Sequence, residues 1–243
     1  MNVYKALSVF TLFLKVAPMA RCTKEEALAT RHGLLDAAEQ MFAEKGVSRT
    51  SLHDIAQAAG LSRGAIYWHF KNKADLFNAM MERITMPMEA TLHQIGHDPG
   101  RDPLDELLCA IRNSMKIIAT DERTRRIFEV ATLKVEYVDE LLAVKERRLK
   151  NRAEVVRQMQ RSLLDASAQR SVSLPVTPLI ASLGLHALVT GLIDSWLMDP
   201  EVFDLVLTAD MAIRTYLAGL GFKLAPLPQG ELSSAPRLPT SAQ

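Results

Sequence analysis

A short stretch of the chain brings together an arginine, a glycine, two aromatic residues and a histidine. These residues are Arg63, Gly64, Tyr67, Trp68 and His69. At 100° per residue, a helix that turns the neighbouring apolar residues inward leaves Gly64, Tyr67 and Trp68 on its outer face. An arginine can read guanine through paired hydrogen bonds, and an aromatic side chain can contact a thymine methyl group or a phosphate. The pattern indicates a helix that reads the major groove of DNA.

This outer face is costly for a helix that faces only water. A glycine inside a seven-residue helix destabilises it by about 1 kcal/mol relative to alanine, and two large aromatic side chains leave apolar surface in contact with water. A DNA groove that covers the rings and lets the backbone approach at Gly64 explains both. In the alternative interpretation a preceding helix covers half of Trp68. The helix then belongs to a helix-turn-helix that does not bind DNA.

The charge around this helix favours DNA, although the whole chain is nearly neutral. The 243 residues include 29 Lys and Arg against 28 Asp and Glu, which gives no overall attraction to nucleic acid. Between Gly46 and Lys73, however, four bases stand against one acid, a local balance of +3. Thr50, Ser51 and Ser62 stand at expected helix starts, where hydroxyl and backbone N–H groups favour phosphate. This part of the chain therefore has the local positive charge that DNA binding requires.

Two short helices joined by a tight turn, over residues 51–59 and 62–70, are expected to position these groups. Ala56 is small where the two helices approach closest, and Gly60 can take the positive φ that the turn requires. A longer amphipathic helix precedes the pair and begins from a capping box at Thr23. Apolar residues stand where the short helices must touch: Ile55, Ala59, Leu61, Ile66 and Phe70. The three segments predict a three-helix helix-turn-helix domain.

The remainder of the chain is also helical, so we expect an all-α fold. A breaker cluster with two glycines and two prolines, GHDPGRDP, occupies residues 96–103, and no window alternates at period two for long enough to demand a strand. The helix from Lys73 to Ile95 joins the two parts, and its interior Pro87 must kink or break it. Later helices are expected over 104–120, 123–137, 139–166, 178–198 and 201–220.

The two ends of the chain fit neither the helix-turn-helix domain nor the helical part that follows it. Residues 1–18 place an apolar run between two lysines, but the run is far shorter than the roughly 20 residues needed to cross a bilayer and has no signal cleavage pattern. A weak signal, a membrane-surface anchor and an upstream extension before a working start at Met19 are the three interpretations. The last agrees with a cytoplasmic DNA-binding protein. Residues 223–243 are rich in Pro and Ser and are expected to be disordered, which leaves domains at 19–80 and 81–222.

Several classes of protein are excluded. Cys22 and Cys109 stand far apart, so the chain has no disulfide framework and is expected to be reduced and intracellular. His93 and His97 have the spacing of a metal pair, but with no third ligand beyond Asp98 we expect no metal site. The sequence contains no phosphate-binding glycine loop and neither a GxSxG nor an HExxH motif. We therefore expect no enzyme and no cofactor.

Residues 50–77, TSLHDIAQAAGLSRGAIYWHFKNKADLF, resemble the DNA-binding domain of the TetR family of bacterial transcriptional repressors. MARCTKEEA from Met19, together with RTRRIFEVATLKVEYVDEL, GLIDSW and FDL further on, resembles the AcrR/TtgR-like branch of multidrug-efflux repressors. The resemblance implies a homodimer on double-stranded operator DNA. It also implies phosphate contacts by Thr50, Ser62, Tyr67, His69 and Lys73, and base contacts by His53, Arg63, Gly64 and Tyr67. Ser51 and Trp68 complete the set of expected DNA-binding residues.

The resemblance also implies a pocket for a small hydrophobic effector in the C-terminal part. Its expected lining residues are Phe128, Thr132, His186 and Val189. Members of this branch tend to carry more polar groups at the first two of these positions, so we expect uncharged or cationic hydrophobic compounds. A lone histidine beside apolar neighbours, such as His186, is more often a satisfied core residue than a ligand contact.

The last two expected helices are apolar on more than one face, with Gly184 and Gly191 allowing close approach. Pairing with a second copy would give a four-helix bundle with a two-fold axis. A monomeric core explains the pattern equally well, and the resemblance decides for the homodimer. The sequence therefore predicts a repressor of an efflux-pump operon that leaves its operator when an effector binds. Its alternatives are a regulator of a metabolic operon and a membrane-associated helical binding protein.

Overall fold

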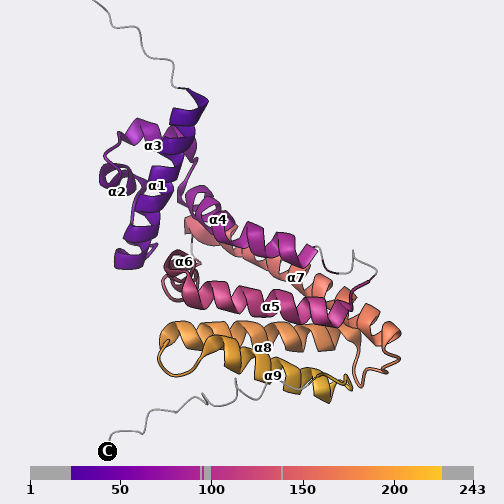
Figure 1. The fold of residues 1–243 in the computed structure, drawn as a ribbon. Helices are drawn as coiled ribbons and strands as arrows, with labels where there is room; N and C mark the ends of the chain where they lie inside the picture. Colours follow the sequence, from indigo (N-terminus) through magenta and orange to yellow (C-terminus); the bar gives the residue numbers. More distant parts are fainter. Residues whose placement is uncertain (1–22, 94, 96–99, 138, 226–243) are drawn as a thin grey trace, which may run out of the picture.

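The computed structural model describes residues 23–93, 95, 100–137 and 139–225. Over these ranges the chain forms nine α-helices and one short 3-10 turn without any strand, which confirms the expected all-α fold (Figure 1). The segment 1–18 and nearly all of the expected tail lie outside the described residues. A small group of helices at one end stands on a larger stack of long helices.

Helices α1 (Lys24–Lys45), α2 (Leu52–Ala58) and α3 (Arg63–His69) form the small group. The capping box at Thr23 is present, with the Thr23 hydroxyl accepting from the Glu26 N–H and the Glu26 carboxylate accepting from the Thr23 N–H. Gly46 ends α1 with φ at 81°, and Gly60 makes the turn between α2 and α3 with φ at 69°. Glycine alone adopts these angles without strain, so the turn predicted at Gly60 is confirmed.

Helix α4 (Lys73–His93) leads from this group to the stack, where it lies beside α7 in Figure 1. Of the kink or break expected at Pro87, the break is wrong, because the helix continues through this residue, and the kink stays a prediction. Pro87 is exposed, and without an N–H it cannot donate to the Arg83 carbonyl one turn before it.

The stack contains α5 (Pro103–Thr120), α6 (Glu122–Leu133), α7 (Leu142–Gln169), α8 (Pro178–Met198) and α9 (Leu205–Gly219), with a 3-10 turn over Asp139–Leu141. Helix α6 ends four residues before the expected Tyr137. Helix α9 begins at Leu205 rather than residue 201, because the Asp204 carboxylate accepts from the Leu207 N–H at 2.9 Å and caps the helix there.

Two hydrophobic cores hold the fold together. The first fills the space between α1, α2, α3 and the first half of α4, and it also takes in Ile127, Val130 and Ala131 from α6. The second lies between α5, α7, α8 and α9. Phe128 contacts both cores. We call α1 to α3 together with Lys73–Ile84 the N-terminal unit, and α5 to α9 the C-terminal unit. The first core contains residues on both sides of the domain boundary expected at residue 80.

Candidate nucleic-acid interface

Helix α3 presents its aromatic residues outward. Trp68 is 73% exposed and Tyr67 is 48% exposed, whereas Ile66 and Phe70 on the opposite side are buried. The predicted orientation of the helix is therefore confirmed, and Trp68 is not covered by α1. The Trp68 and His69 rings meet edge to face at 4.6 Å, and the Arg63 guanidinium lies 5.6 Å from the centre of the Tyr67 ring.

Neither the backbone conformation nor the packing of the described residues requires a glycine at position 64. Its φ lies outside the left-handed region, and an added Cβ would meet only the Ser62 hydroxyl, at an ordinary 3.8 Å. Alanine would fit the same space and would stabilise the helix. The glycine is explained if a surface outside the chain approaches the helix backbone closely at this position.

The serines at the helix starts serve as caps. The Ser51 hydroxyl accepts from the Asp54 N–H at 3.2 Å and donates to the Asp54 carboxylate at 2.7 Å. The Ser62 hydroxyl accepts from the Ala65 N–H at 3.3 Å. Hydrogen bonds from Ser51 lower the pKa of Asp54. Both serines and the neighbouring His53 are exposed, so their caps leave them accessible to a phosphate or a base.

Thr50 and Lys73 lie inside the protein, which the sequence did not indicate. Thr50 is 1% exposed, and its hydroxyl donates to the Gly46 carbonyl at 2.8 Å. The Lys73 ammonium donates to the Thr50 carbonyl at 3.1 Å and forms an ion pair with Glu140 at 2.8 Å. A phosphate contact by either side chain requires these bonds to change, whereas the other eight predicted contacts are exposed or half-buried.

Helix α1 adds a basic residue that the sequence pattern missed. The Arg31 guanidinium lies 4.9 Å from the centre of the Phe70 ring, at the end of α3. Burial and, to a smaller extent, the charge of Arg31 lower the pKa of His69. Because Arg31 precedes α3 by a whole helix, only the packing of α1 against α3 brings it to this site.

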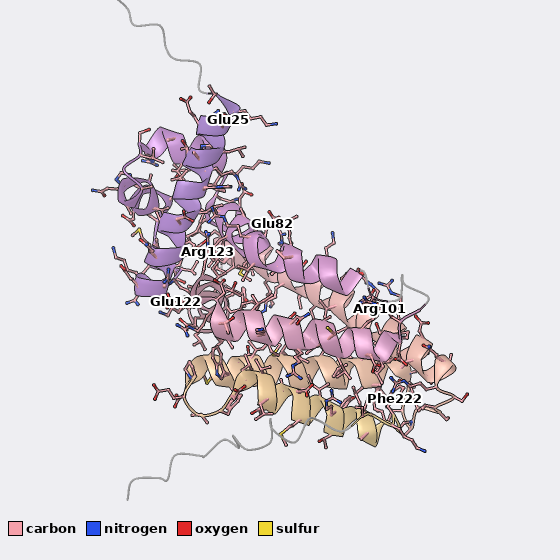
Figure 2. The ribbon with its side chains drawn as sticks, viewed as in Figure 1. Glu25, Glu82, Arg101, Glu122, Arg123 and Phe222 are labelled. Carbon is pink, nitrogen blue, oxygen red and sulfur yellow. The ribbon has the colours of Figure 1, made fainter. Side chains whose placement is uncertain are left out.

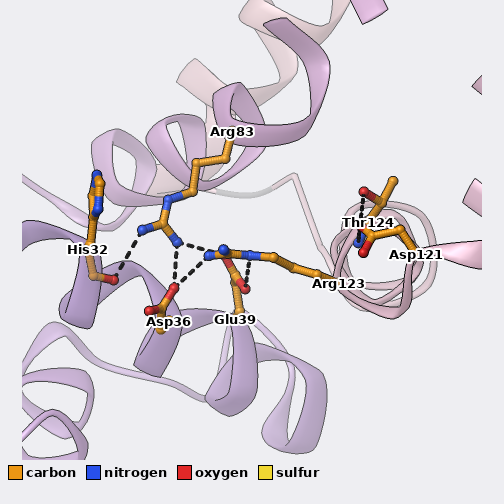
Figure 3. A network of polar contacts seen from close by, with 7 residues as sticks. All are labelled: His32, Asp36, Glu39, Arg83, Asp121, Arg123 and Thr124. Atoms are coloured by element: carbon orange, nitrogen blue, oxygen red, sulfur yellow. Dashed lines mark hydrogen bonds and ion pairs between the residues drawn. The ribbon is translucent and has the colours of Figure 1, made fainter. Parts of the chain in front are cut away.

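A cluster of charges around the buried Glu39 connects this surface to the rest of the protein (Figure 3). Glu39 on α1 is 3% exposed and accepts hydrogen bonds from Arg83 on α4 at 3.0 Å and from Arg123 on α6 at 2.7 Å. Asp36 accepts from the same two guanidiniums at 2.7 Å and 2.6 Å. Figure 2 shows Arg123 where the small group of helices meets the stack. Three helices of both units therefore share one network of ion pairs.

The cluster shifts the ionisation of its members. Partial burial favours the neutral form of Asp36, but the hydrogen bond from Arg83 and the charges of Arg83 and Arg123 outweigh it, so the pKa of Asp36 is lowered. The hydrogen bond to Glu39 raises the pKa of Arg123. Both shifts favour the charged forms of Asp36 and Arg123.

The four predicted effector contacts lie on α6 and α8. Phe128, Thr132 and His186 are half-buried and Val189 is buried. Burial and then the charge of Arg152 lower the pKa of His186, as expected for a neutral core histidine. A cavity of about 400 Å³ lies elsewhere, between α1, α4, α5 and α6, and it is lined by His32, Arg83, Ile84, Pro87, Ile117, Asp121, Arg123 and Thr124.

In the part of the chain that the structure describes, no group of three His, Cys, Asp or Glu residues could hold a metal ion. The side chains of His93, His97 and Asp98 lie outside the described residues, so the expectation that they bind no metal stays a prediction.

A bundle of one long and two short helices with an exposed aromatic and basic face, seated on a larger helical unit, defines a helix-turn-helix DNA-binding regulator. Two family patterns match the chain: bacterial regulatory proteins of the tetR family over residues 34–80, and the C-terminal region of MAATS-type transcriptional repressors over residues 102–222. The chain is 36% identical over 188 residues to the transcriptional regulator AcrR of Shigella flexneri, covering 77% of this chain and 87% of AcrR. It belongs to the TetR family of bacterial transcriptional regulators.

Solved structures agree with this assignment. NalD, the secondary repressor of the MexAB-OprM multidrug efflux pump in Pseudomonas aeruginosa, superimposes with a TM-score of 0.74 at 36% identity, covering 81% of this chain and 98% of NalD. SmeT of Stenotrophomonas maltophilia, in its complex with triclosan, superimposes with a TM-score of 0.71 at 33% identity, covering 83% of this chain and all of SmeT. NalD and SmeT are both described as repressors of multidrug efflux pumps.

Proposed function

We propose that this chain is a cytoplasmic repressor of a multidrug efflux operon, released from its operator when a hydrophobic compound binds the C-terminal unit. The observation that carries the proposal is the exposed face of α3, where Trp68 and Tyr67 face solvent beside a glycine that the fold does not require. The efflux function is supported by the relatives, because NalD and SmeT are described as repressors of such pumps.

A homodimer would place two copies of α3 on one duplex. The outer face of α8 is apolar and uncovered: Ile180 is 56% exposed, and Leu179 and Leu183 beside it are exposed as well. Among the described helices α8 is the one that could cross a membrane by length and composition. Its opposite face lies in the second core, so pairing of the outer faces of α8 and α9 with a second copy explains the apolar surface without a membrane.

The dimer is tested by Ile180→Asp, which puts a charge on this face. We expect sedimentation to show a dimer for the wild type and a monomer for the variant. Leu149→Asp, at an exposed leucine of α7, is the matched control and should stay dimeric. Equal sedimentation of the wild type and Ile180→Asp would remove α8 from the interface.

Operator binding is tested by fluorescence anisotropy with the DNA next to the gene that encodes the chain. We expect binding at physiological salt that is at least about 10³-fold tighter than to a random duplex, as specific regulators show. Triclosan, which SmeT binds, and a panel of other pump substrates should weaken it by a coupling of about 1 to 3 kcal/mol. Equal affinity for operator and random duplex would refute the regulator, whereas specific binding that no pump substrate weakens would point to a metabolic operon.

A further inference from the structure

The segment that follows α6 is seated on the turn that precedes α2. The Val47 N–H donates to the Lys134 carbonyl at 3.1 Å, and the Lys134 ammonium donates to the Ala43 carbonyl at the end of α1. The Ser48 hydroxyl donates to the Glu136 carboxylate at 3.4 Å. The C-terminal unit thus contacts the N-terminal unit directly at the turn before α2, separately from the cluster around Glu39.

Lys73 is at the centre of this contact. Its ammonium lies 2.8 Å from the Glu140 carboxylate, 3.1 Å from the Thr50 carbonyl and 3.4 Å from the Ser48 carbonyl. An ammonium group has three donors, and these three acceptors use all of them. In this arrangement the positive charge of Lys73 has no donor left for an anion outside the protein.

The three acceptors of the Lys73 ammonium belong to different parts of the protein. The two carbonyl groups belong to the N-terminal unit, as Lys73 does, whereas Glu140 belongs to the 3-10 turn before α7. The side chain of Glu140 is 53% exposed, while that of Lys73 is 8% exposed. Water can therefore take up the Glu140 carboxylate at little cost, but the buried ammonium without an anion is costly. A change in the position of the C-terminal unit removes the carboxylate and leaves Lys73 in need of another negative partner.

We propose that Glu140 competes with the DNA backbone for the Lys73 ammonium, so that the C-terminal unit sets how much positive charge the N-terminal unit offers to a phosphate. The inference rests on the proposed DNA-binding function and adds a residue that regulates it. Glu140 is not one of the expected DNA contacts, and in this proposal it acts through Lys73.

The test is Glu140→Gln in the full chain, which removes the charge and keeps the shape. Anisotropy is measured over a range of salt concentrations with the operator DNA and with a random duplex. We expect the variant to bind about fivefold or more tightly, the low end of typical couplings. The slope of log affinity against log salt should steepen by about 0.9, because one more phosphate is neutralised.

Glu136→Gln is the matched control, because it changes the same charge in the same segment but contacts Ser48 rather than Lys73. We expect it to change the affinity less than about twofold and to leave the slope as it is, as a general effect of one exposed charge. In a Lys73→Met background, Glu140→Gln should have no effect, since the two residues act as one pair. Thermal unfolding of each variant shows that it is folded.

The inference is overturned if Glu140→Gln leaves the slope unchanged, if Glu136→Gln has the same effect, or if the effect survives in Lys73→Met. The random duplex separates this result from the proposed function. A wild-type protein without operator preference refutes the specific repressor, while the salt slope of Glu140→Gln on any duplex still decides the role of Glu140. Absence of all DNA binding refutes both.

Discussion

Tyr216 on α9 closes over Gly184 on α8. Its hydroxyl donates to the Ala181 carbonyl at 2.9 Å and occupies the place that a Cβ on residue 184 would take. The close approach predicted at Gly184 is thus made within one chain. Gly191, two turns further along α8, is exposed and has none of the described residues within 4 Å of an added Cβ, so the close approach predicted there is not made within the protomer.

Gly184→Ala is expected to destabilise the fold by about 1 to 3 kcal/mol, because the added methyl group overpacks the contact with Tyr216. Urea unfolding measures the change. Gly33→Ala is the control, since an added Cβ on this glycine of α1 meets nothing within 4 Å, and it should stabilise the protein by up to about 1 kcal/mol. Equal stability of the two variants would show that Tyr216 moves aside freely.

Gly64→Ala is expected to stabilise the free protein and weaken its complex with DNA. The methyl group fits within the chain and removes a helix penalty of about 1 kcal/mol, but it stands between the backbone of α3 and the groove. We expect a loss of operator affinity of about tenfold, or 1.4 kcal/mol, measured by anisotropy. Gly33→Ala gives the same gain in stability and should leave the affinity unchanged; a Gly64→Ala variant with wild-type affinity would place α3 outside the groove.

Arg63→Ala and Lys71→Ala should separate the reading of bases from the binding of phosphates. Among the described residues Arg63 has no ion-pair partner and is exposed, so its loss should reduce discrimination at one base pair by about 1 to 3 kcal/mol. Lys71 is also exposed, and its loss should weaken all sequences alike and reduce the salt slope by about 0.9. Binding to a set of single-base operator variants decides, and the same profile for both variants contradicts the assignment.

Glu39→Gln is expected to destabilise the fold by about 2 kcal/mol. The half-buried Arg83 and the half-exposed Arg123 lose their buried carboxylate partner but keep Asp36. The cost therefore falls below the roughly 3 to 5 kcal/mol of a fully buried pair. Glu129→Gln breaks the more exposed pair with Arg125 and should cost less than about 0.5 kcal/mol. Denaturant unfolding compares the two, and equal costs would show that the buried cluster adds nothing to stability.

The operator affinity of the wild type should increase as the pH falls through the histidine range, from about 7.5 to about 5.5. Burial and then Arg31 lower the pKa of His69, so the free protein gains this charge only below about 6.5. A phosphate beside the ring would raise that pKa, binding would take up a proton, and lower pH would favour the complex. His69→Gln should lose part of the increase between about pH 7.5 and about pH 5.5, while His32→Gln keeps it; equal pH dependence in both removes His69 from the contact.

Much of the fold was predictable because its rules are local. The cap at Thr23, the positive φ of Gly60 and the outward face of α3 depend on neighbours a few residues away, and all are confirmed. The end of α6 was not predictable from periodicity, because the Lys134 carbonyl accepts from the N–H of Val47, a distant residue after α1, rather than from a further turn of the helix. The start of α9 was readable in principle, since Asp204 is a strong capping residue.

The residues of the DNA-binding site also divide into those whose exposure follows from local spacing and those whose burial depends on distant contacts. Helical spacing places Tyr67 and Trp68 on the surface, and the structure agrees. The same spacing cannot show that Thr50 and Lys73 are buried, because Glu140, which pairs with Lys73, is contributed by a distant part of the chain. Ion pairs between units follow from the tertiary fold alone, and a repressor's regulation depends on such contacts.

The sharing of the first core by both units has a practical consequence for how the protein can be divided. Ile127 and Val130 of α6 are fully buried against α1 and α4, so a fragment cut after the helix-turn-helix would leave an apolar wall open to water. Excised alone, the DNA-binding part should aggregate or unfold rather than act as an independent module. A mutation in α6 that weakens this wall would therefore abolish repression by lowering the amount of folded protein, even with every base-reading residue intact.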